Sequence, residues 1–169
     1  MTTIRPERSD DFQFTRNVNR LAFGRAAEAD LVDELRKNGK LIVSLIAETE
    51  SLVVGHIAFS LVTSVSARDV SIAGLAPVSV LPEFQKTGIG SMLVRQGIEE
   101  CRKLGVQAIV VIGHPDYYPR FQFRRASQFG LTCVYGAPDE AFMAMELVEG
   151  ALSACRGMVH YQPEFDVFE

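Results

Sequence analysis

Cysteine is scarce in this chain, and its spacing argues against two common kinds of site. The three cysteines are Cys101, Cys133 and Cys155. An odd number of scattered cysteines without a Cys-x-x-Cys pair predicts neither a disulfide framework nor a zinc site. A nucleophilic thiol at Cys101 would need a neighbouring base and solvent access, and the sequence indicates neither. We therefore expect no metal, and three thiols that lie in the core or near the surface.

An excess of positive charge and long apolar runs are also lacking. The chain has 17 Lys and Arg against 21 Asp and Glu, a formal net charge of −4, so no broad basic face for nucleic acid is expected. The first residues lack the apolar run of a signal peptide, and no uncharged stretch is long enough to cross a bilayer. We expect a cytoplasmic protein without nucleic-acid or membrane partners. Its 169 residues, 47% of them hydrophobic, suit a single domain over residues 1–169 with a sizeable core.

A glycine loop between a strand and a helix is the most informative segment of the sequence. Residues 78–93 read VSVLPEFQKTGIGSML, an apolar strand, a Pro-containing turn, a Gln-x-x-Gly-x-Gly loop and the start of an amphipathic helix. Gly88 and Gly90 let the backbone turn tightly and leave no Cβ in the way of a ligand. The N–H groups of residues 86–91 would then face a phosphate at a helix N-terminus. The segment predicts a pyrophosphate site built from backbone.

Two familiar phosphate loops do not fit this segment. A Walker loop places its Lys and Ser/Thr after the second glycine, whereas Lys86 and Thr87 precede Gly88 here. A dinucleotide loop needs a third glycine, and that position holds Leu93. An ordinary strand-to-helix turn stays the alternative for so short a motif.

The residues after the loop favour a strand–loop–helix–strand unit. An apolar face recurs at helical spacing, formed by Val94, Gly97, Ile98, Cys101 and Leu104. Gly105 stands where a glycine commonly ends a helix. Residues 108–112, AIVVI, are short, continuous and β-branched, as in a strand buried on both faces.

The loop resembles motif A of the GNAT superfamily of acyl-CoA N-acetyltransferases, whose pattern is Gln/Arg-x-x-Gly-x-Gly/Ala after a strand. Residues 74–80, 117–124, 138–147 and 159–165 further resemble the small predicted bacterial acetyltransferases of the YhbS type. The resemblance implies acetyl-CoA as co-substrate and a main-chain N–H, at Val78 or Val80, that polarises the thioester carbonyl. The residues that it implies for cofactor binding are Val78, Ser79, Val80, Gln85, Lys86, Thr87, Gly88, Ile89, Gly90 and Ser91.

The resemblance also implies a general acid. In the family a tyrosine commonly stands four residues before a Gly-Phe pair and protonates the departing CoA thiolate. Tyr118 has this spacing, with Gln122 and Phe123 in the places of that pair. Gln122 departs from the pattern. The alternative is that Tyr117, Tyr118 and the nearby phenylalanines only cover the core, because aromatic side chains bury large areas.

The remaining pattern completes an α/β (α+β) fold of the GNAT type. We expect a mixed central sheet with helices on both faces and two splayed parallel strands, around Val78 and Val110. The other strands are predicted at residues 3–5, 41–47, 52–66, 142–147 and 157–161. A first helix is predicted to start at Asp10 or Asp11 and to bury Phe14, Val18, Leu21 and Ala22. A second helix carries Leu31, Val32 and Leu35 on one face and ends near Asn38 and Gly39.

The sequence leaves the general base and the acceptor open. His56 stands among apolar neighbours and suits a core histidine, whereas His114 and Asp116 belong to a loop before Tyr117. The leading hypothesis is direct acetyl transfer, in a ternary complex, to a primary amine of a small molecule or peptide. A non-catalytic acyl-CoA-binding sensor or accessory protein, an ATP-binding domain and a homodimer are left open as well.

Overall fold

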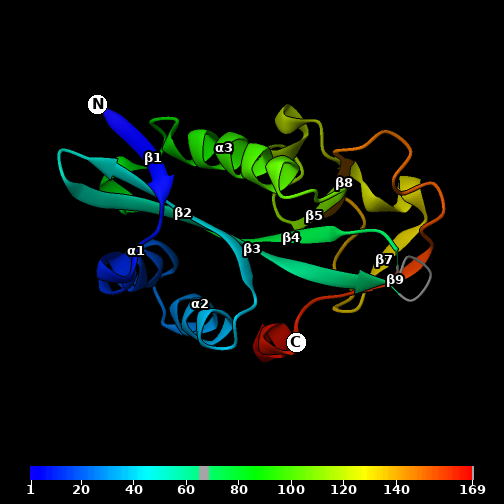
Figure 1. The fold of residues 1–169 in the computed structure, drawn as a ribbon, viewed down its shortest axis with the longest axis horizontal. Helices are drawn as coiled ribbons and strands as arrows, with labels where there is room; N and C mark the ends of the chain where they lie inside the picture. The colour runs from blue at the N-terminus through cyan, green and yellow to red at the C-terminus, as the bar shows by residue number, and fades with distance from the viewer. Residues whose placement is uncertain (65–68, 169) are drawn as a thin grey trace. The chain divides into compact units, whose positions relative to one another are not determined.

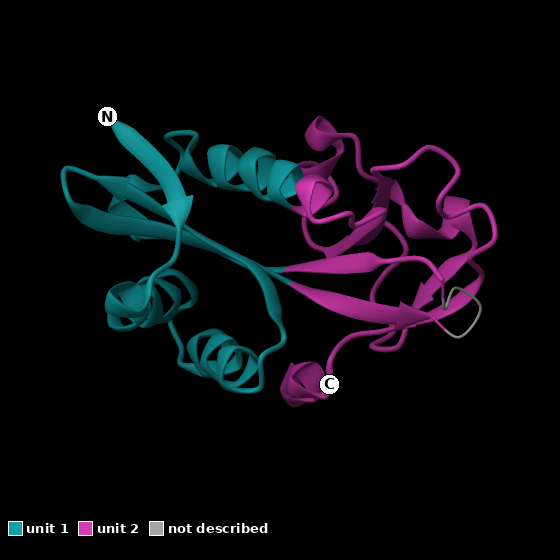
Figure 2. Ribbon diagram, in the orientation of Figure 1, with its two compact units in different colours: residues 1–59, 76–100 teal, residues 60–75, 101–169 magenta. Residues whose placement is uncertain are grey.

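The computed structural model describes residues 1–64 and 69–168. They form two compact units, residues 1–59 with 76–100 and residues 60–75 with 101–169 (Figure 2). The chain passes between the units three times, because β3 (Leu52–Ser64), β4 (Ile72–Val80) and α3 (Ile89–Lys103) each contribute residues to both. We describe each unit by itself.

The first unit places helices on both faces of its strands. It holds β1 (Thr2–Pro6), β2 (Leu41–Thr49), the first part of β3 and the last part of β4. β1 pairs antiparallel with β2 from Thr2–Thr49 to Pro6–Leu45. Figure 1 shows α3 on one side of these strands and α1 (Phe12–Phe23) and α2 (Ala27–Lys37) on the other. The polar residues Glu50 and Ser51 connect β2 to β3 with positive φ at both, as a two-residue hairpin turn requires.

Two of the three helices bury the apolar face that their sequence predicts. Leu31, Val32 and Leu35 of α2 are buried, as are Leu93 and Val94 of α3. Gly97 lets α3 approach β3 closely, because a Cβ there would lie 2.8 Å from the Phe59 Cζ. In α3 only the last predicted position fails, since Leu104 lies beyond the helix and is 61% exposed.

The buried face predicted for the first helix is confirmed at Val18 and wrong at Phe14 and Leu21. Phe14 and Leu21 are 57% and 46% exposed, and the buried residues of α1 are Thr15, Val18 and Asn19. The helix is turned so that two polar side chains face inward, because Asn19 hydrogen-bonds within the interior. Apolar periodicity counts only hydrophobic contacts and could not register this.

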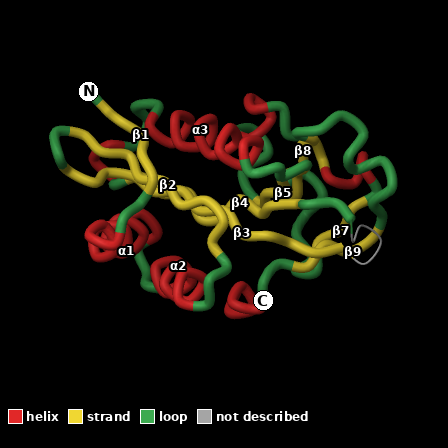
Figure 3. The backbone as a smooth tube through the Cα atoms, in the orientation of Figure 1, coloured by secondary structure: helices red, strands yellow, loops and turns green. Residues whose placement is uncertain are grey.

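The second unit contains the parallel strand pair. β4 and β5 (Ala108–Ile112) pair in parallel from Ile72–Ala108 to Leu75–Val111, and β5 pairs antiparallel with β8 (Phe142–Glu146). β9 (Gly157–His160) pairs antiparallel with β3 and in parallel with β7 (Leu131–Cys133). Two short strands of this unit, β7 and β6 (Arg124–Arg125), were not predicted, because runs of two or three residues carry no periodic signal. Figure 3 labels β7 among the strands.

The described strands pair in the order β1-β2-β3-β4-β5-β8-β6, with β9 joined to β3 and β7. This mixed sheet with helices confirms the predicted fold class. The parallel pairing stops at Leu75–Val111, whereas β4 continues to Val80. Pro77 lies in that continuation, and proline has no N–H to donate to a neighbouring strand.

Most predicted boundaries lie within two residues of the observed ones, and the final predicted residue of β3, Ser66, falls outside the described residues. Cys101, Cys133 and Cys155 are buried free thiols, so the predicted buried position of Cys101 is confirmed and the other two lie in the core as well. No helix in the described residues is long and apolar enough to cross a membrane.

Candidate functional site

The end of β4 presents main-chain groups on one edge. Val78 and Val80 are half-buried, whereas Ser79, between them, is only 4% exposed. Leu81 donates its N–H to the Val54 carbonyl oxygen of β3 at 2.8 Å. Because alternate residues of a strand direct their N–H and C=O groups to opposite sides, those of Val78 and Val80 point away from β3. An extended ligand can add on that side as a further strand does.

Side-chain hydrogen bonds hold the loop that follows β4. The Gln85 amide donates to the Val80 carbonyl oxygen at 3.0 Å, and the Thr87 hydroxyl donates to the Phe84 carbonyl oxygen. Lys86 and Gly88 have φ values of 64° and 91°, so the backbone reverses in the left-handed region. Gln85 and Thr87 thus brace the loop, while residues 85–88 are exposed.

The start of α3 completes a cradle for an anion. The Met92 N–H donates to the Gly88 carbonyl oxygen at 3.0 Å. Because the N–H groups of a helix's first turn have no acceptor inside the helix, they are directed at whatever lies before it. A Cβ built on Gly88 meets no heavy atom within 4 Å, so the space over the loop is open. These observations fit a pyrophosphate group.

The structure brings the predicted cofactor-binding segment together in the first unit. Ile89 is buried, and Gly90 and Ser91 are half-buried in the first turn of α3. The Ser79 hydroxyl is used inside the protein, where it donates to Asn19 Oδ1 at 2.8 Å. Contact between each of these residues and a cofactor stays a prediction.

Tyr118 belongs to the second unit, where it begins a 3-10 helix (Tyr118–Phe121) after the loop at residues 113–117. Its ring is 6% exposed and makes edge contacts with Tyr117 and Phe123 at centroid distances of 5.1 and 5.7 Å. Burial, and secondarily the nearby Tyr117, raise the pKa of the Tyr118 phenol. Within residues 1–64 and 69–168 the Tyr118 hydroxyl makes no hydrogen bond. It therefore keeps its proton at neutral pH and can donate it to a ligand.

Gln122 adopts the backbone conformation that a glycine would take. Its φ is 78°, in the left-handed region, and its N–H donates to the Pro119 carbonyl oxygen at 3.0 Å. The turn between Tyr118 and Phe123 therefore forms without glycine. An L-residue pays roughly 1–2 kcal/mol for this conformation.

His56 is a core histidine, the role that its apolar neighbours predicted. It is fully buried, its Nδ1 lies 3.2 Å from Asn19 Nδ2, and its Nε2 lies 2.9 Å from the Ser44 hydroxyl. Burial lowers its pKa to about 4, with Glu7 opposing this shift and Arg36 adding to it. His114 and Asp116 are exposed in the loop before Tyr117.

The three arginines after Tyr118 each engage a partner of the second unit. Arg120 stacks on the Tyr117 ring at 4.4 Å, and Arg124 stacks on the Phe129 ring at 4.7 Å. Arg125 pairs with Asp139 at 3.1 Å. These contacts favour a structural role for the three arginines. The described residues contain no group of three His, Cys, Asp or Glu that could hold a metal ion.

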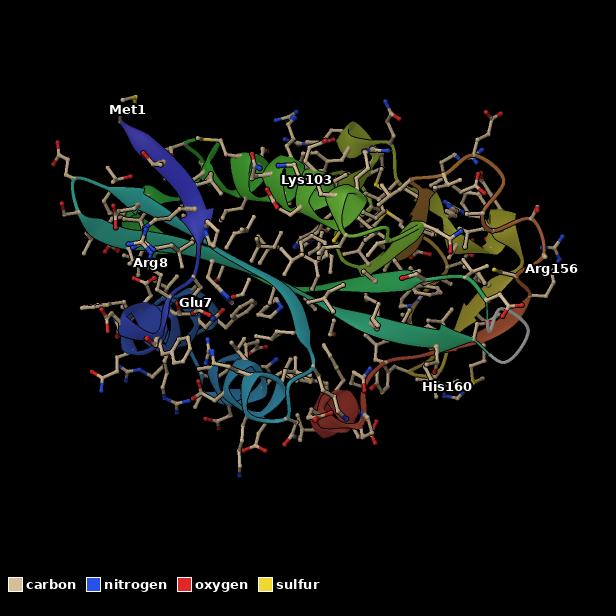
Figure 4. The ribbon with its side chains drawn as sticks, in the orientation of Figure 1. Met1, Glu7, Arg8, Lys103, Arg156 and His160 are labelled. Carbon is tan, nitrogen blue, oxygen red and sulfur yellow. The ribbon has the colours of Figure 1, made fainter. Side chains whose placement is uncertain are left out.

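Sequence reasoning missed the polar residues around His56. Asn19, Ser44 and Ser79 connect with it, and Ser44 donates to Glu7 at 2.9 Å; Glu7 is labelled in Figure 4. One signal was available, because a histidine in an otherwise apolar strand needs polar partners. The sequence could not name those partners, which lie 12 to 37 positions from His56.

Residues 3–121 match the Acetyltransferase (GNAT) family. The uncharacterized N-acetyltransferase YhbS of Escherichia coli strain K12 is 35% identical over 150 residues, 88% of this chain and 89% of that protein. The crystal structure of YhbS from Escherichia coli in complex with CoA has a TM-score of 0.94 at 32% identity, covering 99% of this chain and 93% of that one. A GNAT family acetyltransferase from Brucella melitensis, in complex with acetyl-CoA, has a TM-score of 0.82 at 34% identity, covering 98% and 99%.

These similarities extend over both units, and they agree with the strand–loop–helix cradle and with the mixed sheet described above. The resemblance inferred from the glycine loop and its flanks is confirmed. The chain belongs to the GNAT acetyltransferase family.

Proposed function

We propose that this protein transfers an acetyl group from acetyl-CoA directly to a primary amine, with both substrates bound at once, and that residues 1–169 act as one acetyltransferase domain. The observation that carries the proposal is the cradle formed by the end of β4, the loop at residues 85–88 and the start of α3. Relatives with 32% and 34% identity bind CoA and acetyl-CoA.

In the proposed complex the backbone does most of the binding. The first-turn N–H groups of α3 and the exposed loop hold the pyrophosphate, because free donors and a helix N-terminus favour an anion. The outward edge at Val78 and Val80 pairs with the pantetheine arm. One N–H of that edge polarises the thioester carbonyl, and losing such a donor typically costs about 10²–10³ in rate. Acetyl-CoA supplies the activated acetyl group.

Tyr118 is the proposed general acid. Its raised pKa keeps the phenol protonated, which a proton donor requires. The same burial also raises the pKa of a thiol that leaves beside it, because a low dielectric penalises both anions. The proton therefore has a favourable destination although the tyrosine is a weaker acid than in water.

His56 has no part in deprotonating the acceptor. It is fully buried, and both of its ring nitrogens have partners inside the protein. A general base must come within hydrogen-bond reach of the proton that it removes. An acceptor that arrives as the free amine needs no such base, so turnover should rise with pH as the acceptor loses its proton.

The experiment compares Gly88→Ala with Gly24→Ala, a matched control in the same unit. Both glycines have positive φ, 91° and 69°, and a Cβ on either meets no heavy atom within 4 Å. Both variants should therefore lose a similar amount of stability. Only Gly88→Ala should weaken acetyl-CoA binding measured by calorimetry, because its Cβ enters the phosphate cradle.

Wild-type protein should bind acetyl-CoA and release free thiol with at least one member of a panel of primary amines. A folded wild type that does not bind acetyl-CoA refutes the proposal. Binding without turnover on a broad panel of small amines and peptide N-termini would instead support the non-catalytic acyl-CoA sensor.

A further inference from the structure

A series of buried and partly buried hydrogen bonds in the first unit ends on β4, the strand proposed to bind the cofactor. The Asn19 side chain fixes its direction, because Asn19 Nδ2 lies 3.2 Å from the Thr15 carbonyl oxygen and only the NH₂ group can donate there. With that orientation, Asn19 Oδ1 accepts the hydrogen bond of Ser79 at 2.8 Å. Rotating the amide by 180° would place two acceptors face to face at Thr15.

The orientation of Asn19 determines the tautomer of His56. Asn19 Nδ2 is donor-only, so His56 Nδ1 must be the acceptor of their 3.2 Å contact. The neutral ring then carries its hydrogen on Nε2 and donates it to the Ser44 oxygen at 2.9 Å. Ser44 in turn donates to Glu7 Oε1 at 2.9 Å. Each hydrogen bond in this series thus has one assigned donor and one assigned acceptor.

The series of hydrogen bonds ends, on the side away from β4, in an ion pair. Arg36 Nη2 lies 2.8 Å from both carboxylate oxygens of Glu7, and the Glu7 side chain is 3% exposed. Such charge-assisted bonds are shorter and stronger than neutral ones. The pair holds an acceptor at Glu7 for the Ser44 hydroxyl, in agreement with the direction that Asn19 sets.

This series of hydrogen bonds cannot pass protons to or from β4. Between His56 and Ser79 stands the amide of Asn19, which has no basic nitrogen at neutral pH. A proton relay would be interrupted there. The hydrogen bonds can instead hold the Ser79 side chain in one place.

We propose that Glu7, Ser44, His56, Asn19 and Ser79 form a positioning relay for β4. Ser79 lies between Val78 and Val80, and anchoring its side chain fixes the rotation of the strand about its own axis. That rotation decides where the N–H groups of Val78 and Val80 point, the edge that binds the pantetheine arm. The inference rests on the proposed function for the identity of that ligand, whereas the relay is a property of the protein alone.

Two variants break the relay at different distances from the ligand. Ser79→Ala removes the anchor on β4. Ser44→Ala interrupts the series of hydrogen bonds on the side of His56 that lies away from β4. The matched control is Thr15→Val, which replaces a buried hydroxyl that has no hydrogen-bond partner among the described residues and keeps both the side-chain volume and the backbone carbonyl.

Acetyl-CoA binding is measured by calorimetry at a temperature where circular dichroism shows all proteins folded. Ser79→Ala should raise the Kd roughly tenfold, by analogy with the lower end of what outer-shell partners contribute at metal sites. Ser44→Ala should raise it by a smaller factor, and Thr15→Val should leave it within about twofold. Wild-type affinity in a folded Ser79→Ala variant overturns the proposal, and if that variant does not fold, wild-type affinity in Ser44→Ala overturns it.

A ligand-free measurement separates this inference from the proposed function. In ¹⁵N NMR spectra, wild-type His56 should show the tautomer protonated at Nε2, and Ser44→Ala should shift the amide signals of Val78 and Val80 more than Thr15→Val does. These results support the relay even if acetyl-CoA fails to bind. An Nδ1-protonated His56, or unmoved amide signals, refutes it.

Discussion

The buried His56 makes the stability of this protein depend on pH in a defined window. The perturbation is acidification from pH 7.5 to pH 4. In the folded protein the pKa of His56 is lowered from 6.5 to about 4, chiefly by burial, while Glu7 raises it and Arg36 lowers it. As pH falls below 6.5, the unfolded chain binds a proton that the folded protein refuses, so unfolding becomes more favourable. The contribution is fully present above pH 6.5 and is lost progressively down to about pH 4.

The magnitude follows from the separation of the two pKa values. One pKa unit corresponds to about 1.4 kcal/mol, so the fall from 6.5 to about 4 corresponds to about 3 kcal/mol of unfolding free energy. That is a large part of the 5–15 kcal/mol typical of a folded domain. The physical cause is direct: an imidazolium at His56 would turn an N–H toward the Asn19 NH₂ group.

The assay is urea denaturation of the wild type, His56→Gln and His160→Gln at intervals between pH 7.5 and pH 4. His160 is an exposed histidine on β9 (labelled in Figure 4) and serves as the matched control. His56→Gln should lose about 3 kcal/mol less than the wild type across this range, and His160→Gln should follow the wild type. An NMR titration in which His56 of the folded wild type protonates near pH 6.5 would refute the reasoning, whether or not His56→Gln folds.

Four further substitutions test the second unit. Tyr118→Phe should lower turnover by about 10²–10⁴ and leave acetyl-CoA affinity within a few-fold, whereas Tyr117→Phe should do much less; steady-state kinetics on any accepted amine would show a wrong assignment if the two were reversed. Tyr161→Phe should raise the unfolding free energy by about 1 kcal/mol, because it removes a buried hydroxyl that has no hydrogen-bond partner in the part of the chain that the structure describes; a loss of stability in urea would contradict this. Gln122→Gly should stabilise by about 0.5–1 kcal/mol, since the relief of positive φ exceeds the added chain entropy of glycine, and a lower melting temperature would count against it.

Local signals determined the part of the fold that carries the cradle. The glycines of the loop, the apolar face of α3 and the β-branched run of β5 act over a few residues each, so they could be predicted from the sequence. Gln122 shows the limit of such signals. Its departure from glycine indicated a changed turn, yet the backbone at Gln122 took the left-handed conformation because the packed rings on either side determine the path of the chain.

The polar groups that lie behind β4 depend on three-dimensional packing. Asn19 and Ser79 are 60 positions apart, and nothing in the periodicity of α1 distinguishes an inward asparagine from an exposed one. Apolar spacing therefore placed Phe14 and Leu21 inside, whereas the helix turned Thr15 and Asn19 inward. A buried hydrogen bond has a value only when its partner is present. Local signals in the sequence are enough to predict the elements that form the cradle. Three-dimensional packing determines which polar groups lie behind β4.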